Sequence, residues 1–380
     1  MNRVNIRKIN ELNVLREIFN KAPTSRASVT SELGLTKSTV YSIFSVLTEE
    51  GLIYDIGQGS STRSGGRKPA LTNFNANAGY TINTKINSHT ISCMLNWLDG
   101  SVITYQEYPV TGDTASQHLL ALYQVIRAAV LTDKKLLGIS VGIYGVVHDN
   151  KVVKATISDL VEFNLVEVLH SRFDVPVVLE NEANMSALHI RDFPGSERVK
   201  NAISVSLLDG IGAGIIIDGN LYTGVHSEAG EVGHTPFYGL KQPVPIEDLC
   251  SDLAVMTQLS QLKGHEMDIA DIRKGFDTED ADVERILEQF ITGIVMILQN
   301  LVLSFDPEKI TISSQILRAI PELLTTIAAR VKPFAHKATP IGLSDNPDQA
   351  ALLGGCALIS RKILGLETGE LVFKNRSIPQ

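Results

Sequence analysis

The segment 207–234 constrains the fold most, because it combines alternating glycines, an apolar run and a glycine-flanked pair of polar residues. Gly210, Gly212 and Gly214 come just before the apolar run 215–217. Glycine has no side chain and adopts positive φ freely, so this pattern predicts a turn and a strand that another group approaches closely. That group is a phosphate or another strand, and a Gly-x-Gly-x-Gly pattern alone does not decide between them.

The end of the same segment reads Gly-Glu-Val-Gly-His. Glu231 and His234 lie three residues apart, and the flanking glycines allow both side chains to converge on one small polar ligand. The alternative interpretation is a helix cap or a solvated loop, where polar side chains are equally common.

Length and composition indicate a soluble protein of several domains. The chain has 380 residues, of which 44% are hydrophobic and 20% charged, so we expect two or three domains with sizeable cores. No apolar run reaches the ~18 residues that span a bilayer, and the N-terminus is polar, which predicts a cytoplasmic protein without a membrane partner. Cys93, Cys250 and Cys356 are odd in number and far apart, which predicts buried thiols.

Charge is distributed unevenly along the chain. Residues 1–68 hold 10 Lys and Arg against 6 Asp and Glu, whereas the remaining residues hold 24 against 36. A small basic region before an acidic body indicates that only the N-terminal region meets a polyanion.

The N-terminal region has the pattern of a helix-turn-helix. Apolar residues recur with helical spacing over 7–21, a short helix is predicted over 25–33, and Gly34 ends it. Thr36 then caps a third helix whose apolar face is buried and whose other face is polar, as a major groove requires. The side chains predicted to contact DNA from this helix are Thr36, Lys37, Ser38, Thr39, Tyr41 and Ser42.

A glycine- and serine-rich loop over 57–69 follows a strand near 51–54. It carries Arg63, Arg67 and Lys68, and we interpret it as a basic wing whose arginine enters a narrow, A/T-rich minor groove. A solvated linker between domains is the alternative for the loop. For the region as a whole, the alternative is a three-helix module that binds protein.

The body alternates strands and helices, which predicts an α/β fold of two lobes. Strands are expected over 80–86, 90–98, 102–110, 137–142, 177–179, 202–207, 215–217 and 309–312, with helices over 114–131 and 282–304. The expected domains are 1–75, 76–190 and 191–380, the last containing the long helix 282–304 and a C-terminal helix that returns to the first lobe.

Several motifs of the body occur in the order seen in the ROK family (repressors, open reading frames and kinases), which the chain resembles over nearly its whole length. They are Asp99-Gly100, Gly142-Ile-Tyr-Gly145, Leu179-Glu-Asn-Glu-Ala-Asn184, the alternating glycines, Gly230-Glu-Val-Gly-His234 and Asp348-Gln-Ala-Ala-Leu-Leu-Gly-Gly355. The resemblance implies an N-terminal winged helix-turn-helix on a two-lobed α/β, actin-like (ribonuclease-H-like) body. It is strongest to sugar-responsive repressors of the xylose-repressor type.

The resemblance also implies that kinase chemistry is lost. The family kinases carry Asp-x-Gly-Gly-Thr where this chain has Lys85–His89, and Asp209 and Ser313-Ser314 replace residues that contact the nucleotide. Glu182 stands where the kinases have their catalytic aspartate. We therefore expect no ATP and no catalytic residue, and we expect no zinc, because the loop after His234 lacks the cysteines of the family's zinc site.

The sugar-binding half of the site is retained by the same resemblance. Carboxylates accept hydrogen bonds from vicinal hydroxyls, while an amide or imidazole both donates and accepts. The residues expected to bind a sugar effector are Gly145, Asn164, Asn181, Glu182, Glu231, His234 and Glu247.

The hypothesis is a transcriptional repressor, a homodimer or dimer of dimers, that binds an A/T-rich pseudo-palindromic operator. A sugar or short oligosaccharide bound between the lobes changes operator affinity, as inducer or co-repressor. An active ATP-dependent sugar kinase with a DNA-binding head is one alternative. A scaffold that binds a transport protein is the other.

Overall fold

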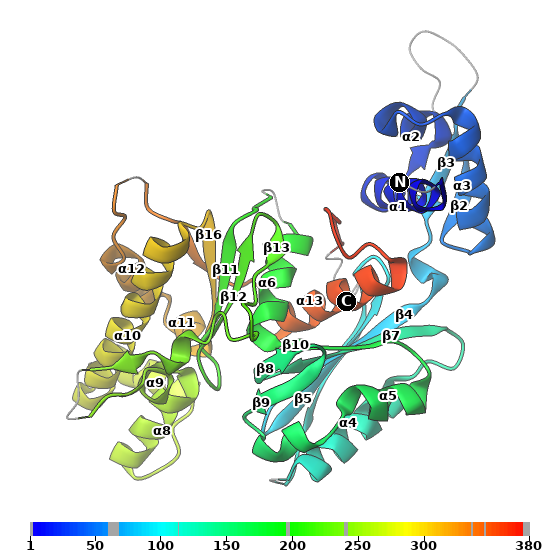
Figure 1. Cartoon of the computed structure of the whole chain (residues 1–380). Helices are drawn as coiled ribbons and strands as arrows, with labels where there is room; N and C mark the ends of the chain where they lie inside the picture. Colours follow the sequence, from blue (N-terminus) through cyan, green and yellow to red (C-terminus); the bar gives the residue numbers. More distant parts are fainter. Residues whose placement is uncertain are drawn as a thin grey trace. The chain divides into compact units, whose positions relative to one another are not determined.

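The computed structural model describes residues 3–59, 68–112, 114–194, 198–238, 242–335, 337–345 and 347–374. The chain forms two compact units, which are not consecutive stretches of sequence (Figure 1). Unit 1 consists of Met1–Val141, Asn164–Val178 and Gly355–Gln380, and unit 2 of Gly142–Phe163 and Leu179–Gly354. The three consecutive domains expected from the sequence stay a prediction.

The N-terminal part of unit 1 contains three helices and a three-stranded antiparallel sheet of order β1-β3-β2. Ser25 and Thr36 cap the second and third helices, and Gly34 ends the second with φ of 62°. The glycine-rich connection lies between β2 and β3, so it joins two paired strands rather than two domains. The elements are α1 (Arg3–Lys21), β1 (Thr24–Ser25), α2 (Arg26–Leu33), α3 (Lys37–Glu49), β2 (Ile53–Gln58) and β3 (Ala70–Phe74).

A C-terminal segment, residues 365–374, packs against α1. Arg16 donates to the Thr368 carbonyl at 2.8 Å, and Asn20 both donates to the Glu370 carbonyl and accepts from the Val372 amide. The Phe19 ring lies 5.0 Å from that of Phe373 and 4.9 Å from that of Phe74. The C-terminal segment therefore fixes α1 through hydrogen bonds and aromatic contacts.

A five-stranded sheet of order β10-β7-β4-β5-β6 is the centre of unit 1 (Figure 1). Gly138 of β7 leaves room for Ile359, since a Cβ there would lie 2.6 Å from that side chain. The elements are η1 (Ala76–Ala78), β4 (Tyr80–Ile86), β5 (Thr90–Trp97), β6 (Val102–Pro109), α4 (Ala115–Ala129), β7 (Leu136–Ile143), α5 (Leu165–Phe173), β10 (Val177–Asn181) and α13 (Pro347–Leu364), whose second half belongs to this unit.

Unit 2 is built on a second five-stranded sheet, of order β13-β12-β11-β16-β17. Helix α6 and the start of α13 lie on one side of this sheet, and α10, α11 and α12 on the other (Figure 1). The elements are α6 (Glu182–Asp192), β11 (Ala202–Ser206), β12 (Gly212–Ile217), β13 (Asn220–Leu221), α10 (Ala281–Phe305), β16 (Lys309–Ser313), α11 (Gln315–Ala319), α12 (Pro321–Arg330) and β17 (Ile341–Leu343).

Smaller elements complete unit 2. Asp149 and Asn150 both have positive φ, which forms a tight turn between β8 and β9. The elements are β8 (Gly145–His148), β9 (Lys151–Ala155), η2 (Ser158–Glu162), η3 (Val232–His234), β14 (Pro236–Phe237), β15 (Val244–Pro245), α7 (Glu247–Cys250), α8 (Asp252–Lys263) and α9 (Ile269–Asp277).

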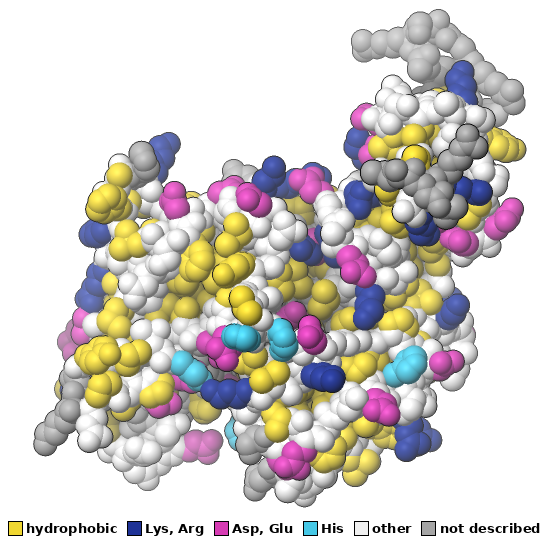
Figure 2. Space-filling model, viewed as in Figure 1, with side chains coloured by type: hydrophobic (Ala, Val, Ile, Leu, Met, Phe, Trp, Pro, Cys, Tyr) yellow, Lys and Arg dark blue, Asp and Glu magenta, His cyan; other side chains and the backbone are white. Residues whose placement is uncertain are grey.

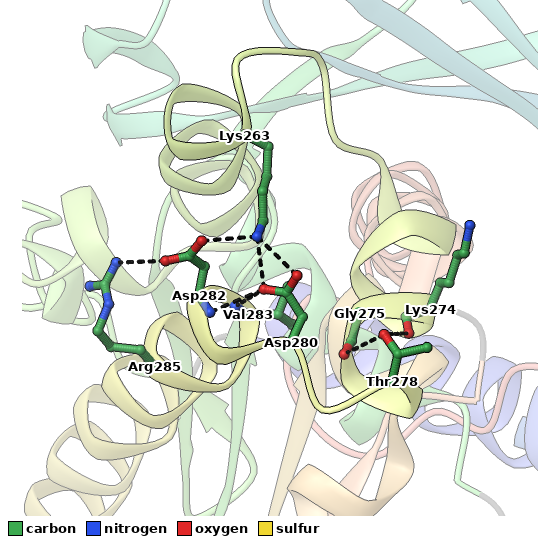
Figure 3. Close-up of polar contacts among 8 residues, drawn as sticks. All are labelled: Lys263, Lys274, Gly275, Thr278, Asp280, Asp282, Val283 and Arg285. Atoms are coloured by element: carbon green, nitrogen blue, oxygen red, sulfur yellow. Dashed lines mark hydrogen bonds and ion pairs between the residues drawn. The ribbon is translucent and has the colours of Figure 1, made fainter.

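Helix α10 is long and apolar enough, by length and composition, to cross a membrane. Its apolar side chains, however, lie in the main hydrophobic cluster of unit 2 with those of β11, β12 and β16, which is typical of a core helix. Asp280 caps its start by accepting from the amides of Asp282 and Val283, and Lys263 binds both aspartates (Figure 3).

Candidate functional site

Unit 2 contains a cavity of about 240 Å³ at the ends of β11 and β12. Six of the seven residues expected to bind sugar line it, although they come from distant parts of the sequence. These six are Gly145, Asn181, Glu182, Glu231, His234 and Glu247.

The first wall of the cavity depends on Gly145 and Asn181. Gly145 has φ of 144°, and a Cβ there would lie 2.1 Å from the Lys154 carbonyl oxygen, so only glycine fits. Asn181 caps α6 by accepting from the Asn184 amide and donates its own amide to the Gly145 carbonyl at 2.6 Å. Asn181 therefore positions the wall and the helix together.

Glu182 is the first residue of α6 and is 3% exposed. Its Oε1 accepts from the Ser186 hydroxyl at 3.1 Å. A carboxylate is favoured in the first turn of a helix, because the helix dipole is positive there. The lining of the cavity thus includes a carboxylate acceptor.

The alternating glycines approach protein groups. A Cβ on Gly214 would lie 2.2 Å from the Ala183 carbonyl oxygen in α6, and one on Gly210 would lie 2.9 Å from Glu247 Oε2. Gly214 therefore approaches a helix rather than another strand, while Gly210 and Gly212 line the cavity.

The second wall contains a chain of hydrogen bonds. Lys154 Nζ lies 2.5 Å from His234 Nε2, and His234 Nδ1 lies 2.8 Å from Glu247 Oε1. Glu247 Oε2 accepts from the Ile211 amide at 3.2 Å. Glu231 lines the same wall, and burial raises the pKa of its carboxyl, while the charges of His234 and Lys154 act in the opposite direction.

Four polar lining residues were not expected from the sequence. Lys154 and Thr156 lie on or just after β9, because the β8–β9 hairpin follows Gly145 directly. The pair Asp149-Asn150 between alternating apolar residues is the signal that predicts this hairpin. The other two are Tyr144 and Ser206.

Asn164, the seventh expected residue, is in unit 1, where its side chain caps α5 by accepting from the Glu167 amide. It is not among the residues that line the cavity. Its role toward a sugar stays a prediction.

Ser313 is the last residue of β16, and Ser314 follows it. The Ser314 hydroxyl donates to Asp252 Oδ1 at 2.7 Å, and the Gln315 amide donates to Oδ2 at 2.6 Å. Asp252 is 2% exposed, and burial raises its pKa to about 7, with a further contribution from the charge of Asp209. The buried Asp252 carboxyl thus accepts from both groups that follow β16.

The third helix of the N-terminal part presents the expected face. Thr36 accepts from the Thr39 amide at 3.2 Å, and the side chains of Lys37, Ser38 and Ser42 are exposed. Tyr41 is 63% exposed and packs under the Arg26 guanidinium, 5.3 Å from the ring centre.

Basic side chains are visible at several points of this region (Figure 2). Lys68, two residues before β3, is exposed, whereas Arg63 and Arg67 lie outside the described residues. The contact of Arg26 with Tyr41 was not expected, because the position of Arg26 at the start of α2 gives no signal for it in the sequence.

Within the part of the chain that the structure describes, no cluster of three His, Cys, Asp or Glu side chains is arranged to hold a metal ion. Cys93, Cys250 and Cys356 are free and buried, and burial raises the pKa of each thiol to about 12. They have the properties of apolar core residues.

The two sheets and their helices define a protein with the fold of the actin-like sugar kinases. The fold is shared with a ROK family transcriptional regulator described as a homologue of E. coli MLC, at a TM-score of 0.77 and 21% identity, over 95% of this chain and 98% of that one. A ROK family glucokinase from Streptomyces griseus, in complex with glucose and AMPPNP, aligns at a TM-score of 0.62 and 21% identity, over 74% of this chain and 99% of that one.

The chain belongs to the ROK family, whose model matches residues 82–362. Among its relatives, the xylose repressor of Lactiplantibacillus pentosus is 35% identical over 382 residues, 98% of each chain. The xylose repressor of Staphylococcus xylosus is 31% identical over 379 residues, 96% of this chain and 98% of that one.

Proposed function

We propose that this chain is a sugar-responsive transcriptional repressor. The observation that carries the proposal is the cavity of unit 2, in which six residues expected to bind sugar hydroxyls come together. An amide, an imidazole and three carboxylates around a small cavity match a ligand with several vicinal hydroxyls. The names of the similar xylose repressors make D-xylose the first ligand to test.

The N-terminal part is proposed as a winged helix-turn-helix that binds operator DNA. Helix α3 is exposed along a face of small hydroxyls, one lysine and one tyrosine, which suits a major groove. The connection between the paired strands β2 and β3 carries the expected wing arginines. As DNA-binding proteins of this class pair their half-sites, we propose a homodimer on an A/T-rich pseudo-palindrome and a cytoplasmic location.

We infer that the body does not phosphorylate sugars and needs neither ATP nor zinc. The support is that the Asp252 carboxyl already occupies the Ser314 hydroxyl and the Gln315 amide beside β16, and that Asp209 adds negative charge where a triphosphate would have to bind. Clear ATP-dependent turnover that Glu182→Gln abolishes would overturn this inference.

The experiment is operator binding by the full chain with and without D-xylose. The Glu231→Ala variant is expected to bind operator with unchanged affinity and to lose the sugar response, because a lining carboxylate is removed. Glu228→Ala is the matched control, since this exposed carboxylate lies three residues earlier and outside the cavity. A response retained in Glu231→Ala places the effector elsewhere.

A further inference from the structure

Lys154 lies in the described lining of the cavity, although the sequence pattern did not predict a cation there. Its side chain is exposed on β9, and its ammonium lies 2.5 Å from His234 Nε2. Lys154 and His234 are 80 residues apart in sequence, and both belong to unit 2.

This contact fixes the direction of the hydrogen bonds. An ammonium group can only donate, so His234 Nε2 must accept, and the ring proton is carried by Nδ1. Nδ1 then donates to Glu247 Oε1 at 2.8 Å, while Glu247 Oε2 is occupied by the Ile211 amide. Nε2 is therefore an acceptor that Lys154 occupies, and both residues line the cavity.

The charges around Lys154 limit what can bind beside it. Three carboxylates, Glu182, Glu231 and Glu247, line the same cavity as Lys154, the one Lys or Arg in its described lining. Because the carboxylates outnumber the ammonium, they repel a ligand that carries an anionic group. The hydroxyl groups of an uncharged ligand find several acceptors instead.

We propose that Lys154 is a specificity-determining residue of the effector cavity. When an uncharged sugar enters, Lys154 donates to one of its hydroxyl oxygens instead of to His234 Nε2, and Nε2 then accepts from a neighbouring hydroxyl, while the lining carboxylates reject sugars that carry a phosphate. The inference rests on the proposed function, in that it assumes a sugar in the cavity.

The test is calorimetric titration of the full chain with D-xylose and with α-D-xylose 1-phosphate. Lys154→Met keeps the length of the side chain but removes the donor and the charge, and it is expected to weaken D-xylose binding at least tenfold. Lys154→Gln keeps a donor without the charge and is expected to stay within about threefold of the wild type. Lys151→Met, an exposed lysine on the same strand outside the cavity, is the matched control.

The phosphate should bind the wild type at least a hundredfold more weakly than D-xylose. Lys154→Met binding within twofold of the wild type would overturn the role of Lys154, and phosphate binding as tight as that of the sugar would overturn the charge selection. Equal losses in Lys154→Gln and Lys154→Met would overturn the role of the donor. If the wild type binds no sugar from a neutral monosaccharide panel, the proposed function itself fails, which separates the two outcomes.

Discussion

The two five-stranded sheets have the same strand order, yet their first hairpins differ. In unit 1, the turn between β4 and β5 is closed by Asn87, whose Oδ1 accepts from the amides of His89 and Thr90 at 2.9 and 2.7 Å. His118 contacts the Ser88 carbonyl in the same turn. In unit 2, the turn between β11 and β12 instead faces the cavity, and its Ile211 amide donates to Glu247.

The same strand order therefore accommodates two different hairpin turns. In the first hairpin, the side chain of Asn87 satisfies two amides of the turn. The second hairpin keeps its glycines and leaves room for a ligand. The first hairpin is therefore closed by its own side chain, whereas the second lines the cavity.

The largest effect should come from the glycines that let β12 approach α6. In Gly214→Ala the new Cβ would lie 2.2 Å from the Ala183 carbonyl oxygen, so α6 must move, and the free energy of unfolding should fall by about 3 kcal/mol. Gly342→Ala in β17 of the same sheet is the control, because nothing lies within 4 Å of its Cβ, and it should change stability by less than about 1 kcal/mol. Urea unfolding measures both, and equal values would mean that β12 and α6 are not in close contact.

The next effect concerns the buried carboxyl beside β16. Burial raises the pKa of Asp252 from 3.8 to about 7, so the folded state holds its proton more tightly than the unfolded state. The stability gained in this way is complete below pH 3.8 and is lost as the pH rises through about 7.

Between pH 5 and pH 8 the free energy of unfolding should therefore fall by roughly 2 kcal/mol more in the wild type than in Asp252→Asn, which does not titrate. Chemical unfolding at several pH values checks this prediction. Parallel pH profiles for the two proteins would contradict the raised pKa of Asp252.

Local patterns were enough to predict most of the framework. Strand 80–86 was predicted with its observed bounds, and the helix expected over 282–304 is found as Ala281–Phe305, because apolar spacing and caps act over a few residues. The strand expected near 51–54 begins at Ile53 and extends to Gln58, since its pairing with β3 sets its length.

Contacts between distant residues could not be predicted in this way. The C-terminal segment binds Arg16 across 352 residues, and Lys154 reaches His234 across 80. Neither contact leaves a periodic signal, so the attachment of α1 and the cation of the cavity became visible only in the structure. Of the six lining residues, Glu231 and His234 were predicted from their spacing and flanking glycines, and the other four only from the family's motifs.

The smallest effect tests the comparison of the two hairpins directly. Asn87→Ala removes the side-chain acceptor that closes the first turn and should lower the free energy of unfolding by about 1 kcal/mol, without changing D-xylose affinity.

Glu247→Gln should instead weaken D-xylose binding, because Glu247 lines the cavity and receives the His234 hydrogen bond. The affinity should fall at least tenfold, since a lost charge-assisted hydrogen bond is worth about 1.5–3 kcal/mol. Unfolding and calorimetry on both variants measure the two effects, and a loss of sugar binding in Asn87→Ala would mean that the first hairpin still contributes to the site.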